Sequence, residues 1–372
     1  MRSAGIRVMI AAGGSGGHIF PAIALGRSLR SRREGIDVMY IGSGKALDKR
    51  IFEREGARYA TLSANKLPYG MSPEIMAASV KLAFDICRVV PMMLSYRPDI
   101  VVGFGGYVSF PVVFIAGIFG IPRLVHEQNL MPGRANKALF NFADRIAVSF
   151  RETKASMDKD SGKVVFTGNP VRPEVLHGGR KDGPGHFGLS PKKFTVLVIG
   201  GSQGATLLSR AFIDALRLMD AGRKSSVQVV HITGVKDYEW VLKAYEALEV
   251  ESRVYSFIDR IEEAYGAADL VITRSGASAL FELAALRKPM ILIPYPYAKS
   301  HQLDNALAFA KHGAAIVMEE AGLKPEALRD CVTGLMDDTG RMRSMAEAAG
   351  NIAVPDASAR LAEEVVKLAG RR

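Results

Sequence analysis

Arg7-Val-Met-Ile-Ala-Ala12 runs directly into Gly13-Gly-Ser-Gly-Gly-His18, so a short apolar stretch ends in a glycine cluster that carries one hydroxyl. The same design returns as Thr195-Val-Leu-Val-Ile199 followed by Gly200-Gly-Ser-Gln-Gly-Ala205. Glycines at a strand-to-helix turn let backbone N–H groups converge on an anion, and the helix that follows adds the positive end of its dipole. Two such turns in matching places predict two nucleotide-fold domains.

Apolar, β-branched runs alternate with helical patterns after each glycine turn, which is typical of parallel sheets with crossover helices. We therefore predict an α/β protein with two Rossmann-like domains. The first series has strands at 6–11, 37–41, 100–102, 123–125, 145–148 and 164–167, and helices at 21–32, 45–55 and 74–95. The second has strands at 195–199, 228–232, 254–257, 270–273 and 290–293, and helices at 237–247 and 278–286.

The domain boundary is indicated by residues 171–191, where Gly, Pro, Lys and Arg accumulate and no periodicity survives. We expect this segment to be a linker between domains at 1–170 and 192–372. The sequence leaves open whether the last predicted helix, 357–368, packs back on the first domain.

The composition is that of a globular protein with two cores, since 48% of its 372 residues are hydrophobic. Cys87 and Cys331 are too few for a disulfide framework and too isolated for a zinc site, which favours a reducing cytoplasm. The stretch Met1–Arg7 carries no hydrophobic leader, so we expect no signal peptide.

The positive charge lies in the first half of the chain. Residues 1–170 hold 23 Lys and Arg against 13 Asp and Glu, a net charge of +10 out of +11. This asymmetry indicates an anionic partner, either a membrane surface or nucleic acid, unless the charge serves only solubility. Nucleic acid is disfavoured, because the basic residues are scattered and no known reading motif is present.

Residues 100–122 carry no charge and are long enough to span a bilayer. Five glycines and two prolines interrupt them, however, and they divide into a strand at 99–103, a turn and a helix at 110–119. A strand buried on both faces of a parallel sheet, followed by its covering helix, is such an apolar run. We therefore expect no membrane span here.

Dinucleotide binding is the obvious alternative for the glycine turns. Its fingerprint requires Gly-x-Gly-x-x-Gly, or Ala at the last position. The first turn has Ile19 at that last position, and the second has Ser202 where the middle glycine belongs. Both departures argue against a nicotinamide enzyme.

Three polar turns follow strands of the first domain: the turn ending in His18, Gly105-Gly-Tyr-Val-Ser109, and His126-Glu-Gln-Asn129. In a parallel sheet such turns lie along one edge, where ligands bind. His18 is a candidate general base there, although a single histidine can equally be a capping or packing residue. His126 and Glu127 are alternatives, either as the base or as groups that orient His18.

Seven motifs in order closely resemble the MurG family, the bacterial undecaprenyl-pyrophospho-muramoyl-pentapeptide N-acetylglucosaminyltransferases. They cover nearly the whole chain: Gly13–His18 with Phe20-Pro21, Gly105–Ser109, His126–Asn129, Gly168-Asn-Pro-Val-Arg172, Gly200–Ala205, Arg274-Ser-Gly-Ala277 and His301-Gln302. The resemblance implies a GT-B glycosyltransferase, with two Rossmann-like domains facing across a cleft. It also implies inverting transfer of GlcNAc from UDP-GlcNAc to the C4 hydroxyl of the muramoyl sugar of lipid I. The products would be lipid II, for peptidoglycan synthesis, and UDP.

The resemblance also implies roles for individual residues. The acceptor would contact Gly14, Tyr107 and Ser109. The donor, UDP-GlcNAc, would contact Ser15, Gly16, Gly17, Asn129, Arg172, Ser202, Ile258, Ala277, Ser278, Ala279, Leu280, Phe281, Glu282 and Gln302. Among these, Arg172 and Ser202 would hold the diphosphate, Ile258 the uracil, Glu282 the ribose, and Gln302 the GlcNAc hydroxyls. Ser15 stands where many members carry threonine, which keeps the hydroxyl.

The residue types suit these tasks. A carboxylate accepts both hydroxyl protons of a ribose, and a glutamine both donates to and accepts from sugar hydroxyls. His18 is preferred as general base because imidazole titrates near the working pH. The only Asp-x-Asp triplet, Asp158-Lys-Asp160, lies in a charged stretch that we interpret as surface. We therefore expect neither a metal nor another cofactor.

A lipid-anchored acceptor implies peripheral binding to the cytoplasmic face of the bacterial inner membrane. Candidate partners are then an anionic membrane surface and the cell-wall and division machinery that sets cell shape. Helix 74–95 has an apolar stripe of Ile75, Leu82, Ile86 and Val89 beside Lys81 and Arg88, which serves either the core or the membrane. The remaining alternatives are another GT-B enzyme, such as a UDP-GlcNAc epimerase or a diacylglycerol glycosyltransferase, and a non-catalytic membrane-binding module.

Overall fold

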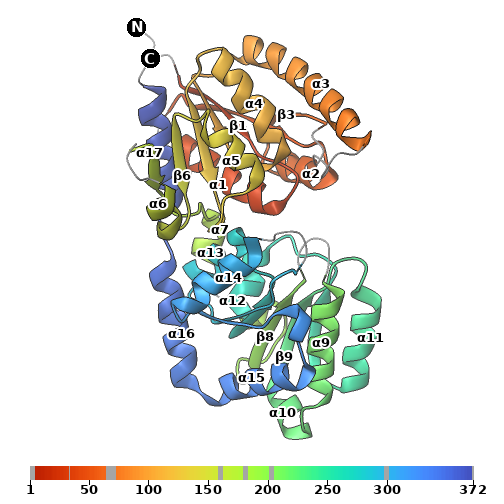
Figure 1. Ribbon diagram of the computed structural model, residues 1–372. Coiled ribbons are helices and arrows are strands. Elements are labelled where there is room, and N and C mark those ends of the chain that lie inside the picture. The colour runs from red at the N-terminus through yellow and green to blue at the C-terminus, as the bar shows by residue number, and fades with distance from the viewer. Residues whose placement is uncertain are drawn as a thin grey trace. The chain divides into compact units, whose positions relative to one another are not determined.

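The computed structural model of the protein describes residues 5–32, 34–63, 73–157, 162–178, 183–200, 205–296 and 301–370. The chain forms two compact units (Figure 1). Unit 1 comprises Met1–Arg172 and Val354–Arg372, and unit 2 comprises Pro173–Ala353. Each unit contains one parallel sheet with helices on both faces, which is the doubly wound arrangement predicted from the sequence.

Unit 1 has a seven-stranded sheet in the order β3-β2-β1-β4-β5-β6-β7. Its strands are β1 Arg7–Ala11, β2 Asp37–Gly42, β3 Arg58–Thr61, β4 Ile100–Gly103, β5 Arg123–Glu127, β6 Arg145–Val148 and β7 Val164–Phe166. Its helices are α1 Gly16–Arg32, α2 Ala46–Arg54, α3 Pro73–Tyr96, α4 Gly106–Ile118, α5 Arg134–Phe140, α6 Arg151–Met157 and α17 Ala357–Ala369.

Unit 2 has a six-stranded sheet in the order β10-β9-β8-β11-β12-β13. Its strands are β8 Phe194–Ile199, β9 Val227–Ile232, β10 Glu251–Tyr255, β11 Leu270–Thr273, β12 Met290–Leu292 and β13 Ala315–Val317. Its helices are α7 Pro173–Gly178, α8 Gly183–His186, α9 Thr206–Arg217, α10 Ala221–Ser226, α11 Tyr238–Leu248, α12 Ile261–Ala267, α13 Ala277–Ala285, α14 His301–Lys311, the 3₁₀ turn η1 Glu320–Gly322, α15 Pro325–Asp337 and α16 Thr339–Ile352.

Both sheets reverse their winding direction beside their central strand. In unit 1 this switch point lies between β1 and β4, and in unit 2 between β8 and β11. Ligands of doubly wound sheets bind outside the carboxyl ends of the strands at such a point. Each glycine turn follows the central strand, β1 or β8, and therefore lies at the predicted ligand edge of its own unit.

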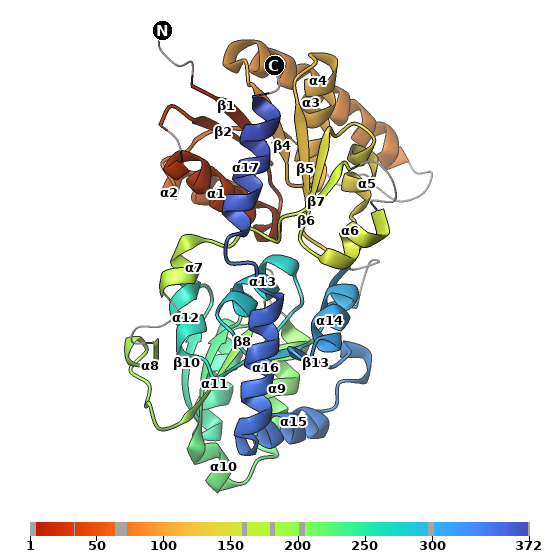
Figure 2. The same cartoon turned by 90° about the vertical axis from the view of Figure 1, so that its left-hand side faces the viewer.

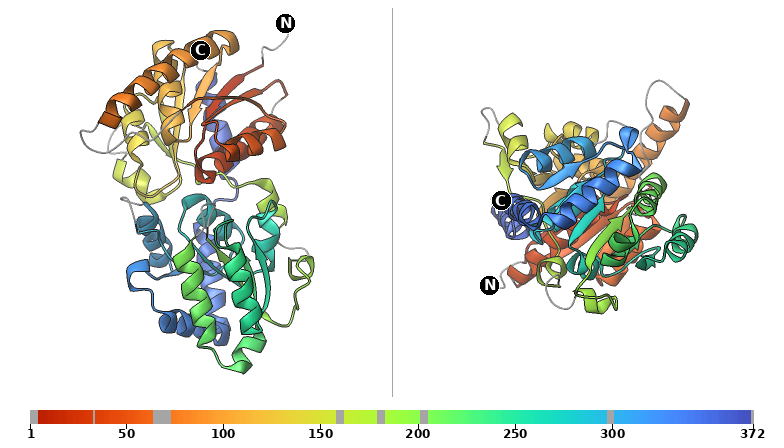
Figure 3. Two further views of the ribbon diagram at one scale, coloured as in Figure 1. Left: turned by 90° about the vertical axis from the view of Figure 1, so that its right-hand side faces the viewer. Right: turned by 90° about the horizontal axis from the view of Figure 1, so that it is seen from below.

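Alternate side chains of β1 serve the two faces of the first sheet. Val8 and Ile10 pack with α1 and α17, whereas Met9 and Ala11 pack with α3 and α4. In unit 2, α9 and α11 lie side by side on one face of the sheet (Figure 3, left). All these strand residues are buried, as expected for a parallel sheet covered on both faces.

The last helix, α17, belongs to unit 1 although the chain reaches it from unit 2. It runs beside α1, where Leu361 and Val365 are fully buried (Figure 2). Burial of one such side chain contributes about 1.5–3 kcal/mol. The division between the units falls after Arg172, beside the predicted boundary at 170, and the segment predicted as a linker contains α7 and α8.

The structure differs from the sequence prediction at two helix starts. Helix α1 begins at Gly16, not at Pro21, because the N–H groups of His18 and Ile19 already donate to the Ser15 carbonyl at 3.1 and 3.2 Å. Helix α4 begins at Gly106, not at Phe110. The glycines of the turns after β1 and β4 therefore belong to the first turns of α1 and α4. The first N–H groups of a helix do not bond to carbonyl groups of the helix itself.

Residues 100–122 form β4, a tight turn and α4, as predicted. Among the described residues, no helix combines the length and apolar character needed to cross a bilayer.

Candidate active site

The first glycine turn of unit 1 is held by Asp48, a fully buried carboxylate of α2. Asp48 accepts hydrogen bonds from the N–H of Gly14 at 3.1 Å and from the N–H and hydroxyl of Ser43 at 2.7 and 2.6 Å. Gly14 has a φ of +86°, which favours glycine. The turn is thus fixed with Gly16 and Gly17 in the first turn of α1.

His18 lies at the end of this turn with its ring partly exposed. Its Nδ1 is 3.3 Å from the Gly13 carbonyl oxygen and 3.2 Å from the Ser15 hydroxyl. A protonated Nδ1 that donates to the carbonyl leaves Nε2 as the acceptor. Burial lowers the pKa of His18 below 6.5, against the opposing effects of the Gly13 carbonyl and of the Glu127 and Asp48 charges. The ring is therefore neutral at neutral pH and able to take a proton.

The second polar turn, after β4, lies against His18. Gly106 has a φ of +73°, and a Cβ there would stand 3.1 Å from the Gly13 carbonyl oxygen and 3.3 Å from His18 Nδ1, so this position favours glycine. Tyr107 follows with 36% of its side chain exposed. Ser109 is fully buried, and its hydroxyl lies 2.9 and 2.7 Å from the carbonyls of Ala11 and Gly105. Ser109 therefore supports the turn from inside the unit.

The third polar turn, after β5, is organised by the buried carboxylate of Glu127. Its Oε1 accepts from the backbone and side-chain N–H groups of Asn129 at 2.9 and 3.0 Å, and its Oε2 from Gly133 N–H at 3.1 Å and from Asn136 Nδ2 at 2.8 Å. Four donors hold this carboxylate in place. Asn129 itself is only partly buried, so it presents part of its surface outward.

His126 is fully buried, in contrast to His18. Its Nε2 lies 3.2 Å from the Gly168 carbonyl, Nδ1 lies 3.1 Å from Gln128 Nε2, and the ring packs 5.2 Å from that of Phe104. Burial lowers the pKa of His126 to about 4. Both ring nitrogens have protein partners, so among the three candidate bases His18 is the one whose geometry suits proton transfer.

Arg172 is the last residue of unit 1 before the chain enters unit 2. Its guanidinium carbon stands 4.2 Å from the ring centre of Phe20 on α1, and its residue surface is 9% exposed. A stacked guanidinium is preorganised for a phosphate. Phe20 thus holds Arg172 against α1, the helix that also carries Gly16, Gly17 and His18.

In unit 2, the residues 201–204 of the second glycine turn, Ser202 among them, lie outside the described part of the chain. The next strand ends are described. Ile258 is partly buried after β10, and its neighbour Phe257 is 44% exposed. Such a pair at a sheet edge provides an apolar surface of the kind that a nucleobase can contact.

Helix α13 begins at Ala277, one residue before the predicted start at 278, after the short loop 274–276 that follows β11. Its N-cap Gly276 makes no side-chain capping bond, and Ser278 and Ala279 follow in the first turn. Leu280 and Phe281 are buried in the core and contribute only backbone to the helix start. One turn on, Glu282 is 5% exposed, and the Tyr265 hydroxyl donates to its Oε2 at 3.2 Å.

Gln302 lies in the first turn of α14, where it is partly buried. Its side-chain oxygen accepts from Tyr295 N–H at 3.0 Å, and its carbonyl accepts from the Ser275 hydroxyl at 2.8 Å. These bonds connect α14 to the loop after β11, so Gln302 is fixed beside the start of α13.

Sequence reasoning missed several residues that organise these turns: Asp48, Asn136 and Asp237. Asp237 is buried and accepts from the Thr206 hydroxyl at 2.9 Å and from Trp240 Nε1 at 3.0 Å, beside the second glycine turn. No motif marks these positions. Within the described ranges, no group of three or more His, Cys, Asp or Glu is placed to hold a metal ion, and Asp158-Lys-Asp160 lies outside those ranges.

Two doubly wound domains form the GT-B fold, and the family models that match them make the chain a glycosyltransferase of this fold. The N-terminal domain model of glycosyltransferase family 28 matches residues 8–148, and the C-terminal domain model of that family matches residues 195–361. The chain belongs to the MurG family within this class.

Named relatives support this assignment along almost the entire chain. The UDP-N-acetylglucosamine–N-acetylmuramyl-(pentapeptide) pyrophosphoryl-undecaprenol N-acetylglucosamine transferase of Halalkalibacterium halodurans is 37% identical over 96% of this chain and 98% of its own. The Bacillus subtilis protein of the same name is 35% identical with the same two coverages. The crystal structure of Acinetobacter baumannii MurG superposes with a TM-score of 0.75 at 26% identity, covering 97% of this chain and 99% of that one.

The UDP-GlcNAc 2-epimerase of Neisseria meningitidis shares the fold alone. Its TM-score is 0.70 at 14% identity, over 97% of this chain and 100% of that chain. The fold is thus common to both classes of enzyme.

Proposed function

We propose that the protein transfers GlcNAc from UDP-GlcNAc, with inversion, to the C4 hydroxyl of the muramyl sugar in a pentapeptide-bearing, pyrophosphoryl-undecaprenol acceptor. This proposal rests on the agreement between the names of the relatives and the positions of the predicted site residues. Near-full-length relatives bear the name of this reaction, and many of the predicted site residues follow the carboxyl ends of strands in the two sheets. The products would be lipid II and UDP, for cell-wall synthesis.

Unit 2 would bind the donor. The first turn of α13 directs N–H groups toward the sheet edge, and its dipole favours the diphosphate. Glu282, fixed by Tyr265, would accept the ribose hydroxyls, Ile258 would contact the uracil, and Gln302 would bind the sugar hydroxyls.

Unit 1 would bind the acceptor and supply the base. The His18 Nδ1 contact with the Gly13 carbonyl supports a tautomer in which Nε2 accepts the proton of the attacking hydroxyl. Gly14 and Tyr107 border the same turn and would contact the acceptor, while Asn129 would meet the transferred sugar. Glu127 orients this third turn and acts through Asn129.

No metal is needed for this mechanism. The negative charge that develops on the departing UDP would be met by Arg172, by the first-turn N–H groups of Gly16 and Gly17, and by the start of α13. Within its own unit, each of these donors is already held in place by the fold.

The protein would reach its lipid-anchored acceptor by peripheral binding to an anionic membrane, at the cytoplasmic face of the bacterial inner membrane. The stripe considered in the sequence faces mainly inward: Val89 is buried, Leu82 and Ile86 are partly buried, and the side chain of Ile75 lies outside the described residues. A second stripe of α3 is exposed, with Val80 at 65%, Phe84 at 57% and Leu94 at 55%.

Helix α4, which packs on α3, also has exposed apolar residues at its end. Ile118 and Phe119 are 67% and 39% exposed there. Arg88 stands 5.9 Å from the Phe84 ring and adds positive charge to the apolar face. Apolar area combined with basic residues supports interfacial binding. At the membrane, the cell-wall and division machinery are candidate partners.

The proposal is tested by one transfer assay. Purified protein is incubated with UDP-[¹⁴C]GlcNAc and a short-chain lipid I analogue, and the labelled lipid product is analysed for linkage. We expect label at the muramyl C4 hydroxyl. Release of UDP with epimerised free sugar, or no label in the lipid, would contradict the proposed reaction.

A further inference from the structure

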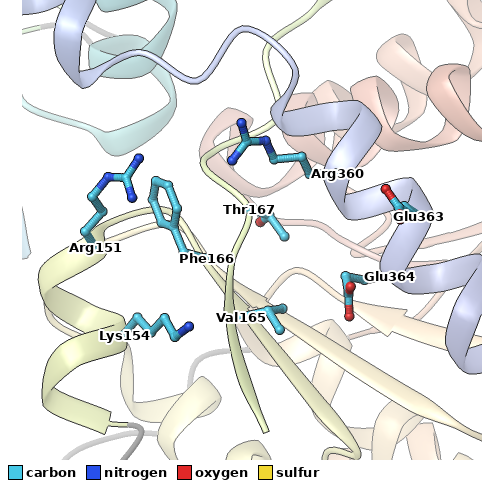
Figure 4. Close-up of a pocket in the computed structure, with 8 residues that line it drawn as sticks. All are labelled: Arg151, Lys154, Val165, Phe166, Thr167, Arg360, Glu363 and Glu364. Carbon is cyan, nitrogen blue, oxygen red and sulfur yellow. The ribbon is translucent and has the colours of Figure 1, made fainter. Parts of the chain in front are cut away.

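A cavity of about 470 Å³ opens in unit 1 beside β7, the edge strand of the sheet (Figure 4). Helix α6 forms one wall and α17 the other, and Val165, Phe166 and Thr167 lie between them. None of the donor, acceptor or base residues described above lines this cavity. It is therefore a separate feature of the acceptor unit.

Basic side chains gather at the end of the cavity nearest the carboxyl end of β7. Arg151 and Arg360 stand on opposite sides of Phe166 and Thr167 there, and the Arg151 guanidinium carbon lies 4.3 Å from the Phe166 ring centre (Figure 4). Lys154, one turn further along α6, points into the cavity from the same wall. Three cations thus converge from two helices.

The acidic side chains of the cavity and Arg360 already have partners. The ion pairs join Glu363 to Lys367 at 2.8 Å, Glu364 to Arg145 at 3.3 Å, and Arg360 to Asp356 at 2.8 Å. In the part of the chain that the structure describes, neither Arg151 nor Lys154 has a carboxylate within ion-pair distance. Among the carboxylates that the structure describes, none pairs with these two positive charges, which therefore attract an anion.

The backbone of β7 offers a second recognition element. Lys163 accepts from Ile146 N–H at 3.0 Å, and Thr167 N–H donates to Val148 at 3.2 Å. In a parallel ladder the residues between them direct their backbone groups the opposite way, so Val164 and Phe166 face the open edge. An extended peptide can pair with such an edge through its main chain.

We infer that this cavity binds the carboxylate-bearing peptide of the acceptor, with Arg151 and Lys154 as its carboxylate ligands. The inference rests on the proposed function for the identity of the acceptor. A strand edge flanked by uncompensated cations suits an extended acidic peptide better than an isolated phosphate, because the phosphate would use only the cations.

The distances within unit 1 allow one acceptor to use both places. The cavity and the His18 turn lie at the ends of β7 and β1–β4 in the same sheet, and three strand spacings separate β4 from β7, about 14 Å. A pentapeptide in extended form spans up to about 17 Å. The peptide can therefore place its terminal carboxylate in the cavity while its sugar lies at His18, and only its last residue would then pair with the β7 edge.

Binding is measured first, without any transfer reaction. A pentapeptide with an acylated N-terminus and free carboxylates is titrated into the full-length protein, alongside its fully amidated form and inorganic phosphate. We expect the free acid to bind, the amide to bind about tenfold more weakly, and R151A/K154A to lose that difference. K49A/R50A, which removes the same charges from α2, should behave as wild type.

Kinetics then connect the cavity to the reaction. With short-chain acceptors, R151A/K154A should raise the acceptor KM about tenfold for the free-acid peptide and leave it unchanged for the amidated peptide. Its kcat and donor KM should match those of wild type.

Equal binding of acid and amide by wild type, or phosphate binding as tight as that of the acid, would overturn the inference. So would an equal rise in KM for both acceptors, which would assign the cations to the pyrophosphate or the membrane. Failure of wild type to use either acceptor would instead contradict the proposed function. The peptide titration would still show whether the cavity binds the peptide.

Discussion

The two units have the same central strand order but carry different residues at the ends of their central strands. In unit 1 the turns after β1, β4 and β5 bring together an imidazole, a tyrosine and an asparagine. In unit 2, α9 begins after β8 and α13 begins after β11; Glu282 lies one turn into α13, and Gln302 lies in the first turn of α14. A shared scaffold therefore fixes where ligands bind, and the residues at the strand ends decide which ligands and which reaction.

Charge separates the units as well. The net charge of +10 over residues 1–170 belongs to the unit with the exposed apolar stripe of α3, while residues 171–372 carry a net charge of +1. This distribution fits a membrane-facing acceptor unit and a donor unit that takes its substrate from solution. The predictions below test this division between an acceptor unit and a donor unit.

Replacement of the proposed base gives the largest effect. His18→Ala should lower kcat roughly 10²–10⁴-fold, because proton removal from the acceptor loses its catalyst. The pH–rate profile of wild type should fall on the acidic side with an apparent pKa below 6.5, since the lowered pKa of His18 keeps the ring neutral down to that range. Ser15→Ala removes one contact of Nδ1 and one predicted donor contact but keeps the imidazole, so it should lower kcat much less than His18→Ala does.

A His18→Ala enzyme with near wild-type kcat and the same acidic limb would exclude this base. Glu127 would then be examined next, and His126 after it, although His126 has both nitrogens engaged.

The buried histidine of unit 1 should make stability fall in acid. His126 has a pKa of about 4 in the folded state against 6.5 when unfolded, so the unfolded state takes up its proton first as the pH falls. The free energy of unfolding should decrease by about 3 kcal/mol from pH 6.5 to pH 4 on this account. Urea unfolding of wild type and His126→Asn across that range measures it, with a flatter pH dependence expected for the variant.

Unit 2 also contains a buried histidine, His231, which lies between Ser209 and Tyr245. Burial lowers the pKa of His231 to about 3. Because His231 still titrates in the His126→Asn variant, the free energy of unfolding of that variant should still decrease somewhat as the pH falls. Identical slopes for wild type and variant would mean that His126 does not titrate as described.

Loss of the ribose carboxylate should affect the donor alone. Glu282→Ala should weaken UDP binding by about 1.5–3 kcal/mol, roughly tenfold to a hundredfold, because a charged acceptor is removed. Calorimetric titration with UDP measures the change. Glu282→Gln keeps the shape and should recover part of the affinity, whereas unchanged affinity in both variants would refute the ribose assignment.

The exposed apolar stripe should govern membrane affinity. Phe84→Ser should weaken binding to vesicles containing anionic phospholipid by roughly fivefold to tenfold, since less apolar area leaves water. High salt should release much of the wild-type protein, because screening over about 8 Å weakens the attraction of scattered basic residues. Val235→Ser, at an 84% exposed position of unit 2, is the matched control and should bind as wild type.

The smallest effect is expected from chelation. Transfer should continue at an unchanged rate in EDTA, because Arg172 and the helix N–H groups are proposed to take the place of a metal. Complete loss of activity that magnesium or manganese restores would contradict this part of the mechanism.

The sequence predicted the parallel sheets because buried strands such as β11 are uniformly apolar and lie between glycine-rich turns. It missed β3 and misjudged the start of α1, since helix formation by Gly16 and Gly17 depends on the turn that Asp48 and Ser43 hold from elsewhere in the chain. Of the site, the turn residues could be found by motif. The buried partners could not, because Asn136 and Asp237 act through contacts that no local pattern encodes.

The division of α3 into two apolar stripes shows the same limit. Ile86 and Val89 recur at helical spacing, and so do Val80, Phe84 and Leu94. Which stripe faces the core depends on where α3 meets the sheet and α4, and that is a tertiary contact.

The division of labour between the units is tested most directly by titrating UDP into three full-length proteins: wild type, His18→Ala and Glu282→Ala. The account predicts that His18→Ala binds UDP with wild-type affinity although its turnover is lost, and that Glu282→Ala binds it at least tenfold more weakly. If His18→Ala instead loses UDP affinity while Glu282→Ala keeps it, the assignment of base to unit 1 and donor to unit 2 is contradicted.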